Sequence, residues 1–221
     1  DLDRTLYDFD RCNRETLQDM FGMHKLRQEG IPDFDAFLGI YKGINKGLWE
    51  LYKTGQITKQ ELNRERFART LGHFGINHML SKDMAADYIR LSPLKTHLIP
   101  GSIELLEYLK PKYHLHIITN GFDEIQFRKI DRCGLGKYFS HVITSEDAGV
   151  QKPDTGIFQY AFRLTGAEPA LSLLIGDDPD SDVAGAYKSG MDVVWLAGKE
   201  EVSEYPPTLR ITELSELKQW L

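Results

Sequence analysis

Two aspartates lie two residues apart at the start of the chain, within the run from Asp1 to Thr5. If both leave the end of a strand, the carboxylate of Asp1 can act as a nucleophile while that of Asp3 moves a proton. A strand of about five or six residues should then precede Asp1, and we expect the natural protein to contain it. Paired aspartates are also common in solvent-exposed loops, so this interpretation needs support from other segments.

Three further segments carry groups that bind phosphate or metal ions. Thr119, Asn120 and Gly121 offer a hydroxyl and backbone amides at a predicted strand-to-helix turn, which is an anion-binding arrangement. Lys152 precedes a predicted helix and supplies a fixed cation. The last segment follows an apolar run and is rich in carboxylates, which are hard oxygen ligands suited to Mg²⁺. Its aspartates are Asp177, Asp178, Asp180 and Asp182.

The elements predicted around these segments bring them to one edge of a sheet. After residue 93, helical patterns alternate with short apolar runs at residues 114–119, 141–144, 171–175 and 192–196. This alternation predicts βαβ units and a parallel sheet. Open α/β sheets bind their ligands just past the carboxyl ends of the strands, and the four segments fall in that region.

The stretch from about Asp10 to Leu91 has the periodicity of helices. Thr58 and Glu61 form a capping box, which predicts the start of the third helix in this stretch. Ser81 is predicted to cap a fourth helix. The whole stretch is therefore expected to be helical.

The chain is long enough for a core with a smaller domain inserted into it. It has 221 residues, of which 41% are hydrophobic and 27% are charged, and these values are ordinary for a globular protein. The predicted fold class is α/β, with a doubly wound, Rossmann-like parallel-sheet core. Residues 1–9 and 93–221 would form that core, and residues 10–92 would form a helical cap inserted after the first strand.

Charge and composition exclude some partners. The net charge is -6, so the chain lacks the basic surface that non-specific binding of nucleic-acid polymers requires. No apolar run approaches the roughly 18 residues that a membrane helix needs, and we expect no membrane partner. Cys12 and Cys133 form no C-x-x-C pair, which favours reduced thiols in a cytoplasmic protein.

In their order and spacing, the four segments resemble the four motifs of the haloacid-dehalogenase superfamily, and the resemblance covers nearly the whole chain. The helical insert lies where some members carry a helical cap, between the first and second motifs. In detail the chain resembles the pyrimidine 5′-nucleotidase branch, although sugar-phosphate phosphatases such as the N-acylneuraminate-9-phosphatases have similar motifs. The residues that carry the finer resemblance are Asp1–Asp10, Ile118–Phe122 with Gln126, Gly149–Asp154 with Ile157 and Phe158, and Gly176–Gly185.

The resemblance implies a Mg²⁺-dependent phosphomonoester hydrolase that works through an aspartyl-phosphate. Asp1 would be the nucleophile, and Asp3 would protonate the leaving oxygen and then deprotonate the attacking water. Asp1, the backbone carbonyl of Asp3 and Asp177 would bind Mg²⁺. Asp178 and Asp182 would not bind the ion themselves but would lie next to its ligands and hold them in position.

The same resemblance assigns the phosphate-binding residues and the substrate class. Thr119, Asn120, Gly121 and Lys152 would bind the phosphoryl group together with Asp1, and Thr119 and Lys152 would also take part in catalysis. The substrate would be a small phosphorylated metabolite, with a pyrimidine nucleoside 5′-monophosphate as the leading expectation and a sugar phosphate as the alternative. The protein would be a monomer or a homodimer.

Two positions depart from the pattern of these relatives. Arg4 stands where a small or acidic residue is usual, and its side chain is expected to face solvent. Two alternatives stay open for Arg4, namely an added cation beside the site and a disturbed, less active site. Asp178 stands where a Ser, Thr or Asn is usual, and its extra charge could tighten or duplicate metal binding.

Three other functions use a similar set of residues. A haloacid dehalogenase needs a carboxylate nucleophile but neither Mg²⁺ nor a proton shuttle, so the presence of Asp3 and Asp177 argues against it. A phospho-accepting signalling domain has its acidic pair before its phosphorylated aspartate, which is the reverse of the order here. A catalytically silent phosphate-binding protein of this fold is supported only by Arg4.

Overall fold

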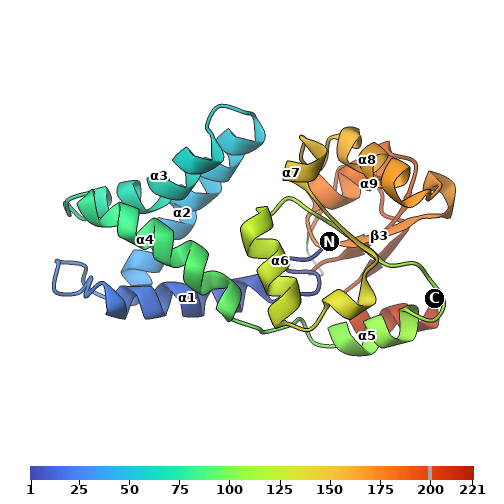
Figure 1. The fold of residues 1–221 in the computed structure, drawn as a ribbon, viewed down its shortest axis with the longest axis horizontal. Coiled ribbons are helices and arrows are strands. Elements are labelled where there is room, and N and C mark those ends of the chain that lie inside the picture. Colours follow the sequence, from blue (N-terminus) through green and yellow to red (C-terminus); the bar gives the residue numbers. More distant parts are fainter. Residues whose placement is uncertain (199–200) are drawn as a thin grey trace. The chain divides into compact units, whose positions relative to one another are not determined.

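The chain folds into two compact units, which the computed structural model describes over residues 1–198 and 201–221. One unit consists of Asp1–Phe9 and Thr96–Leu221 and contains both helices and strands (Figure 1). The other consists of Asp10–Lys95 and is helical. The fold is therefore of the α/β class with an inserted helical domain, as the sequence predicts.

The α/β unit contains parallel strands, and helices lie between successive strands from β1 to β4. Over the described residues the strands pair in the orders β1-β2 and β3-β4-β5, and every strand pair is parallel. Parallel strands cannot be joined by a tight turn and need a longer crossover connection. Between β4 and β5 that connection has no helix among its described residues. The elements of this unit are α5 (Ser102–Leu109), β1 (His116–Thr119), α6 (Asp123–Arg132), η2 (Gly136–Tyr138), β2 (His141–Thr144), α7 (Ser145–Ala148), α8 (Thr155–Thr165), η3 (Pro169–Leu171), β3 (Leu173–Gly176), η4 (Pro179–Val183), α9 (Ala184–Lys188), β4 (Asp192–Leu196), β5 (Leu209–Ile211) and η5 (Leu214–Gln219).

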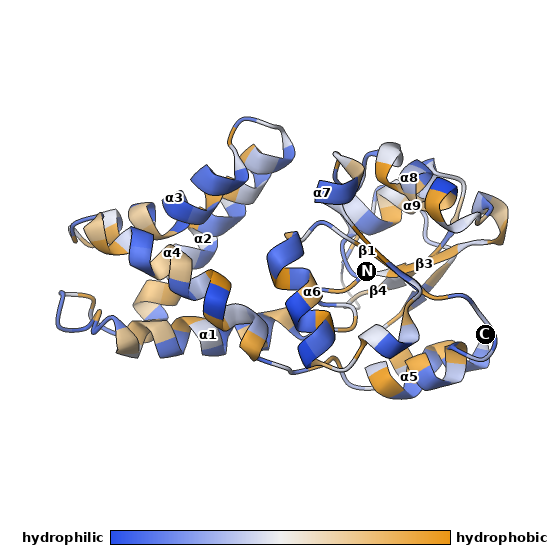
Figure 2. Ribbon diagram, in the orientation of Figure 1, coloured by the Kyte–Doolittle hydropathy of each residue, from blue (hydrophilic) through white to orange (hydrophobic). Residues whose placement is uncertain are grey.

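Apolar strand residues form the core of the α/β unit. Helices α8 and α9 cover one side of the strands, and α5 lies on the other (Figure 1). The strands are mainly hydrophobic, whereas the helices carry both hydrophobic and hydrophilic residues (Figure 2). Ile143, Phe158, Val193 and Trp195 are among the buried side chains that pack together between strands and helices. This packing holds the strand ends in fixed positions relative to one another.

The helical unit has its own hydrophobic core. Phe37 and Tyr41 stack with ring centroids 6.1 Å apart, and Tyr41 lies 5.5 Å from Phe67. Each unit therefore buries an apolar cluster of its own, as expected of separate domains. The helices of this unit are α1 (Phe9–Met23), α2 (Phe34–Lys53), α3 (Lys59–His73), α4 (Met79–Leu91) and η1 (Ser92–Leu94).

Local signals in the helical unit were partly correct. The capping box of Thr58 and Glu61 is present at the start of α3, which confirms that prediction. The prediction that Ser81 caps α4 is wrong, because α4 begins at Met79 and Ser81 lies in its first turn. The side chain of Asn77 accepts a hydrogen bond from the Met79 nitrogen (2.9 Å), which accounts for the earlier start.

The two chain segments that lead to and from the helical unit pair with each other inside the α/β unit. Tyr7 and Leu98 form an antiparallel bridge. The Asp8 nitrogen donates to the His97 carbonyl (3.0 Å), and the Ile99 nitrogen donates to the carbonyl of Leu6 (2.9 Å). The chain thus leaves the α/β unit and returns to it at neighbouring positions.

No helix in the described part of the chain is both long enough and apolar enough to cross a membrane. Neither Cys12 nor Cys133 forms a disulfide in the described part of the chain. The cytoplasmic location expected from the sequence stays a prediction.

Candidate active site

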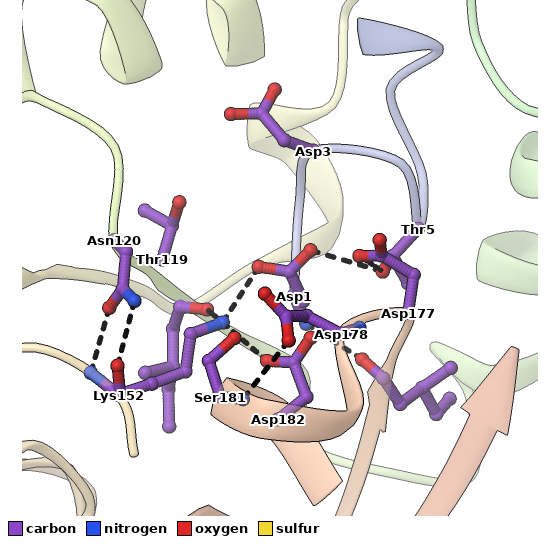
Figure 3. A network of polar contacts seen from close by, with 12 residues as sticks. Asp1, Asp3, Thr5, Thr119, Asn120, Lys152, Asp177, Asp178, Ser181 and Asp182 are labelled. Carbon is purple, nitrogen blue, oxygen red and sulfur yellow. Dashed lines mark hydrogen bonds and ion pairs between the residues drawn. The ribbon is translucent and has the colours of Figure 1, made fainter. Parts of the chain in front are cut away.

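Polar residues gather at the carboxyl ends of β1 and β3. Thr119 is the last residue of β1, and Asp177 directly follows β3. The Asp1 nitrogen donates to the carbonyl of Ile175 in β3 (2.8 Å), which places Asp1 at the same edge. Figure 3 shows the side chains of Asp1, Lys152 and Asp177 close together at this edge. The segments of Asp1, Lys152 and Asp177 therefore meet where parallel strands of the two sheets end.

Lys152 is the central cation of this site. Its side chain is only 2% exposed. The ammonium group lies 2.7 Å from Oδ1 of Asp1 and 2.6 Å from Oδ1 of Asp182, and it also donates to the Ile118 carbonyl (2.9 Å). A buried ammonium is strongly destabilising unless it is paired and hydrogen-bonded, and these three acceptors satisfy all of its hydrogens.

The side chain of Asn120 holds the backbone of Lys152. Its Nδ2 donates to the Lys152 carbonyl (3.0 Å), and its Oδ1 accepts from the Lys152 nitrogen (2.8 Å). These two bonds connect the turn after β1 to the loop between α7 and α8 (Figure 3). The predicted phosphate-binding residue Asn120 thus also fixes the position of the cation.

Three carboxylates form a cluster beside this lysine. Oxygen atoms of Asp1, Asp177 and Asp182 all lie within 4.8 Å of one another. The Thr5 hydroxyl lies 3.0 Å from Oδ2 of Asp1 and 3.3 Å from Oδ1 of Asp177, so it bridges the first and last segments. Carboxylate oxygens at this separation match the preference of Mg²⁺ for hard oxygen ligands.

The charges in the cluster are only partly balanced. Burial and the neighbouring charge of Asp182 raise the pKa of Asp177 to about 7, although the Arg4 guanidinium opposes part of this rise. Burial also acts to raise the pKa of Asp182, but the ammonium of Lys152 holds that pKa below its ordinary value. A carboxylate with a raised pKa beside two others is a site that a divalent cation would stabilise, so the residues present fit Mg²⁺.

The side chains of Asp182 and Asp178 are held by the turn that follows β3. Oδ1 of Asp182 accepts from Lys152, and its Oδ2 accepts from the Asp178 nitrogen (3.1 Å). A Cβ atom at Gly176 would overlap the Asp182 side chain, so only glycine fits at that position. Oδ1 of Asp178 accepts from the nitrogens of Asp180 (2.9 Å) and Ser181 (3.2 Å) and so caps η4.

The side chain of Asp3 lies apart from the carboxylate cluster. Figure 3 shows its carboxylate directed away from Asp1 and Asp177. Oδ1 of Asp3 lies 2.6 Å from the Lys129 ammonium, and its Oδ2 accepts from Nε2 of Gln126 (3.0 Å). The two aspartates of the first motif are therefore in different surroundings, and each is paired with its own lysine.

Arg4 is exposed, as expected, but its charge still acts on the site. Its backbone has a left-handed conformation (φ 66°), which is uncommon for a residue other than glycine. Its guanidinium lies 4.6 Å from the centre of the Phe9 ring. Its positive charge opposes the rise in the pKa of Asp177 that burial and Asp182 cause. Arg4 thus faces solvent and at the same time adds a positive charge near Asp177.

Three residues of this site were not assigned a role from the sequence, and these are Thr5, Gln126 and Lys129. Thr5 lies two residues beyond Asp3, so its proximity to Asp1 was open to inference once a turn is assumed there. Gln126 and Lys129 are three residues apart on α6, which places both on one helix face. That spacing could have shown that the two residues act together, but it does not reveal that their shared partner is Asp3, which is distant in the sequence.

The chain matches the family described as haloacid dehalogenase-like hydrolase over residues 1–196. The pyrimidine 5′-nucleotidase PynA of Streptococcus pneumoniae is 33% identical over 88% of this chain and 81% of its own length. The pyrimidine 5′-nucleotidase YjjG of Escherichia coli is 32% identical over 100% of this chain and 95% of its own length. The protein therefore belongs to the haloacid dehalogenase-like hydrolases.

The fold has a close counterpart among solved structures. The HAD-hydrolase YfnB of Bacillus subtilis is 31% identical over 98% of this chain and 91% of its own length. Its crystal structure, determined bound to magnesium, has a TM-score of 0.89 and covers 100% of this chain and 95% of that one. The predicted fold class is thereby confirmed.

Proposed function

We propose that this protein is a Mg²⁺-dependent phosphomonoester hydrolase that forms an aspartyl-phosphate on Asp1. The observation that carries the proposal is the position of the Asp1 carboxylate. One of its oxygens is 2.7 Å from the Lys152 ammonium, the other accepts from Thr5, and the carboxylates of Asp177 and Asp182 lie beside it. Phosphoryl transfer requires a nucleophile placed among fixed positive charges, because its catalysis rests on positioning and charge stabilisation.

The reaction would proceed in two steps at phosphorus. In the first, an oxygen of Asp1 attacks phosphorus, the bond to the leaving oxygen breaks, and Asp3 gives that oxygen a proton. In the second, water attacks the aspartyl-phosphate, Asp3 takes a proton from the water, and phosphate leaves as the Asp1 carboxylate is restored. Thr119 and the backbone amides of Asn120 and Gly121 would bind the phosphoryl oxygens.

Asp1, Asp177 and the backbone carbonyl of Asp3 would hold Mg²⁺. Both oxygens of Asp182 already accept hydrogen bonds, which suits that residue, with Asp178, to a supporting role. When bound, the ion would supply the positive charge that lets an anionic carboxylate approach an anionic phosphate.

The substrate that we propose is a pyrimidine nucleoside 5′-monophosphate. Two relatives that cover most of the chain, PynA and YjjG, are pyrimidine 5′-nucleotidases. A sugar phosphate is the alternative, since phosphatases of this fold with other substrates are also similar to the chain. Among them is a phosphoserine phosphatase of Thermus thermophilus, which is 35% identical over 98% of this chain.

The test is phosphate release from pyrimidine and purine nucleoside monophosphates and from sugar phosphates, each with Mg²⁺ and with EDTA. Asp1→Asn is the matched control, because it removes the nucleophile and keeps the size of the side chain. We expect Mg²⁺-dependent release, fastest with pyrimidine monophosphates, and no turnover by the variant. Release led by sugar phosphates would keep the mechanism and reject the substrate. Equal rates in the wild type and in Asp1→Asn would reject the mechanism itself.

A further inference from the structure

Lys129 and Gln126 hold the Asp3 carboxylate from one side. Both belong to α6, and both are buried, with Gln126 0% and Lys129 3% exposed. The Lys129 ammonium lies 2.6 Å from Oδ1 of Asp3, and Gln126 Nε2 lies 3.0 Å from Oδ2. Each carboxylate oxygen therefore has its own donor, so the rotation of this side chain is fixed.

The surroundings of Lys129 leave Asp3 as its charged partner. Its ammonium lies 4.7 Å from the centre of the Tyr7 ring and 5.3 Å from that of Phe9. Aromatic faces attract a cation but remove it from water, so a buried lysine there needs a carboxylate. Asp3 provides it, in the one ion pair that the structure describes for Lys129 among residues 1–198 and 201–221.

Gln126 connects Asp3 to the phosphate-binding turn. Besides Asp3, its Nε2 donates to the Thr119 hydroxyl (2.7 Å), and a side-chain amide has two hydrogens for these two bonds. Its Oε1 is buried and has no hydrogen-bond partner in the described part of the protein. The opposite amide orientation would direct Oε1 at the Asp3 carboxylate, so the bonds to Asp3 and Thr119 determine the orientation.

Gly121 makes room for this arrangement. A Cβ atom at Gly121 would overlap the Gln126 side chain at Nε2 and at the carbons next to it. Gly121 has no left-handed φ, so its backbone does not require glycine. The need for glycine at this position of the second motif therefore comes from the close approach of Gln126.

We propose that Lys129 and Gln126 are positioning residues for the proton transfers of Asp3, and this inference rests on the function proposed above. They take no proton themselves. Asp3 gives its proton to the leaving oxygen when Asp1 attacks, and it takes one from water when the aspartyl-phosphate breaks. Lys129 and Gln126 keep the carboxylate directed away from the metal-binding cluster, so Asp1 alone serves as the nucleophile.

The test compares two kinds of leaving group in Lys129→Met, Gln126→Leu and the control Arg128→Met, which removes an exposed positive charge from the same helix. A nucleoside monophosphate has an alkoxide leaving group that needs a proton, whereas nitrophenolate leaves from p-nitrophenyl phosphate without one. For nucleoside monophosphate we expect turnover to fall about 100-fold to 1,000-fold in both α6 variants. General acid–base catalysis usually contributes about 100-fold to 10,000-fold, and a carboxylate that has lost one of its two donors should lose part of that. Arg128→Met should be unchanged.

With p-nitrophenyl phosphate the two steps separate. The first step should keep its rate in Lys129→Met, while the second slows because water loses its base. The result is a burst of one nitrophenolate per enzyme, followed by slow turnover. Lys129→Arg, which keeps the charge, should recover part of the activity. A purely structural role predicts equal losses on both substrates without a burst, and that outcome would overturn the proposal.

A double-mutant comparison covers the case in which Lys129→Met does not fold. In an Asp3→Asn background, Lys129→Met leaves no unpaired charge of this ion pair. It should then cause no further loss of turnover, because Lys129 acts through the Asp3 carboxylate. Additive losses would contradict the proposal. Failure of the proposed function looks different, since wild-type protein would then release no phosphate from either substrate, or Asp1→Asn would be as active as the wild type.

Discussion

The raised pKa of Asp177 predicts that the metal-free protein loses stability as the pH rises. In the unfolded chain this carboxyl has an ordinary pKa of 3.8, and in the folded protein the pKa is about 7 because of burial and the charge of Asp182. Between these two values the unfolded state has released the proton while the folded state retains it. The contribution of Asp177 is therefore fully present below pH 3.8 and is lost as the pH rises through about 7.

The size of this effect follows from the difference between the two pKa values. Each pH unit corresponds to about 1.4 kcal/mol, so Asp177 would lower the free energy of unfolding by about 4 kcal/mol at pH 8 relative to pH 4. This value is an upper limit, because Asp177 is only half-buried and water screens part of the charge. Binding of Mg²⁺ should restore the lost stability above pH 7, since it favours the ionised carboxylate.

Urea unfolding with EDTA, at several pH values from 5 to 8, measures this contribution when wild type and Asp177→Asn are compared. The asparagine variant lacks the titrating group, so its stability should exceed that of the wild type increasingly as the pH rises. Mg²⁺ should stabilise the wild type strongly at pH 8 and the variant little. Parallel pH dependence of the two proteins would refute the assignment of a raised pKa to Asp177.

Three further changes have defined outcomes. Lys152→Met should lower the free energy of unfolding by about 3–5 kcal/mol in urea unfolding, since it leaves two carboxylates without their cation; a loss below 1 kcal/mol would contradict the buried pairing. Gly121→Ala should reduce turnover of a nucleoside monophosphate to the level of Gln126→Leu, whereas Gly39→Ala, where a Cβ meets open space, should not. Burial, followed by the charges of His141 and His114, lowers the pKa of His116, so stability present above pH 6.5 is lost on acidification. Thermal unfolding of His116→Phe should therefore decline less from pH 7 to pH 5 than that of the wild type, and equal declines would count against this.

The sequence predicted those site residues that follow strands. Asp177 directly follows β3, and Thr119 ends β1. They come from segments far apart in the chain, yet the alternation of helices and strands was enough to predict that they lie close together. Strands that pair in parallel have their carboxyl ends on the same side of a sheet, and this does not depend on how the side chains pack. For the same reason the α/β fold class with an inserted helical domain was predictable from periodicity.

Features that depend on tertiary contacts were not predictable. Nothing in the local sequence distinguishes Lys129 from other charged helix residues, because its partner Asp3 is 126 positions away in the sequence. Strand β5 is short, and its residues become a strand by pairing with β4 in register from Val194 to Leu196. In each case a contact decided between options that local sequence leaves equal.

The paired segments around Tyr7 and Leu98 affect how this protein can change during evolution. Because the chain leaves and re-enters the α/β unit at bonded neighbours, the inserted domain closes a loop whose ends are fixed by the core. The inserted domain also has a hydrophobic core of its own, so the burial of its apolar residues does not depend on the α/β unit. An insert of different size or sequence could therefore replace the present one while the strand ends that position Asp1, Lys152 and Asp177 stay in place.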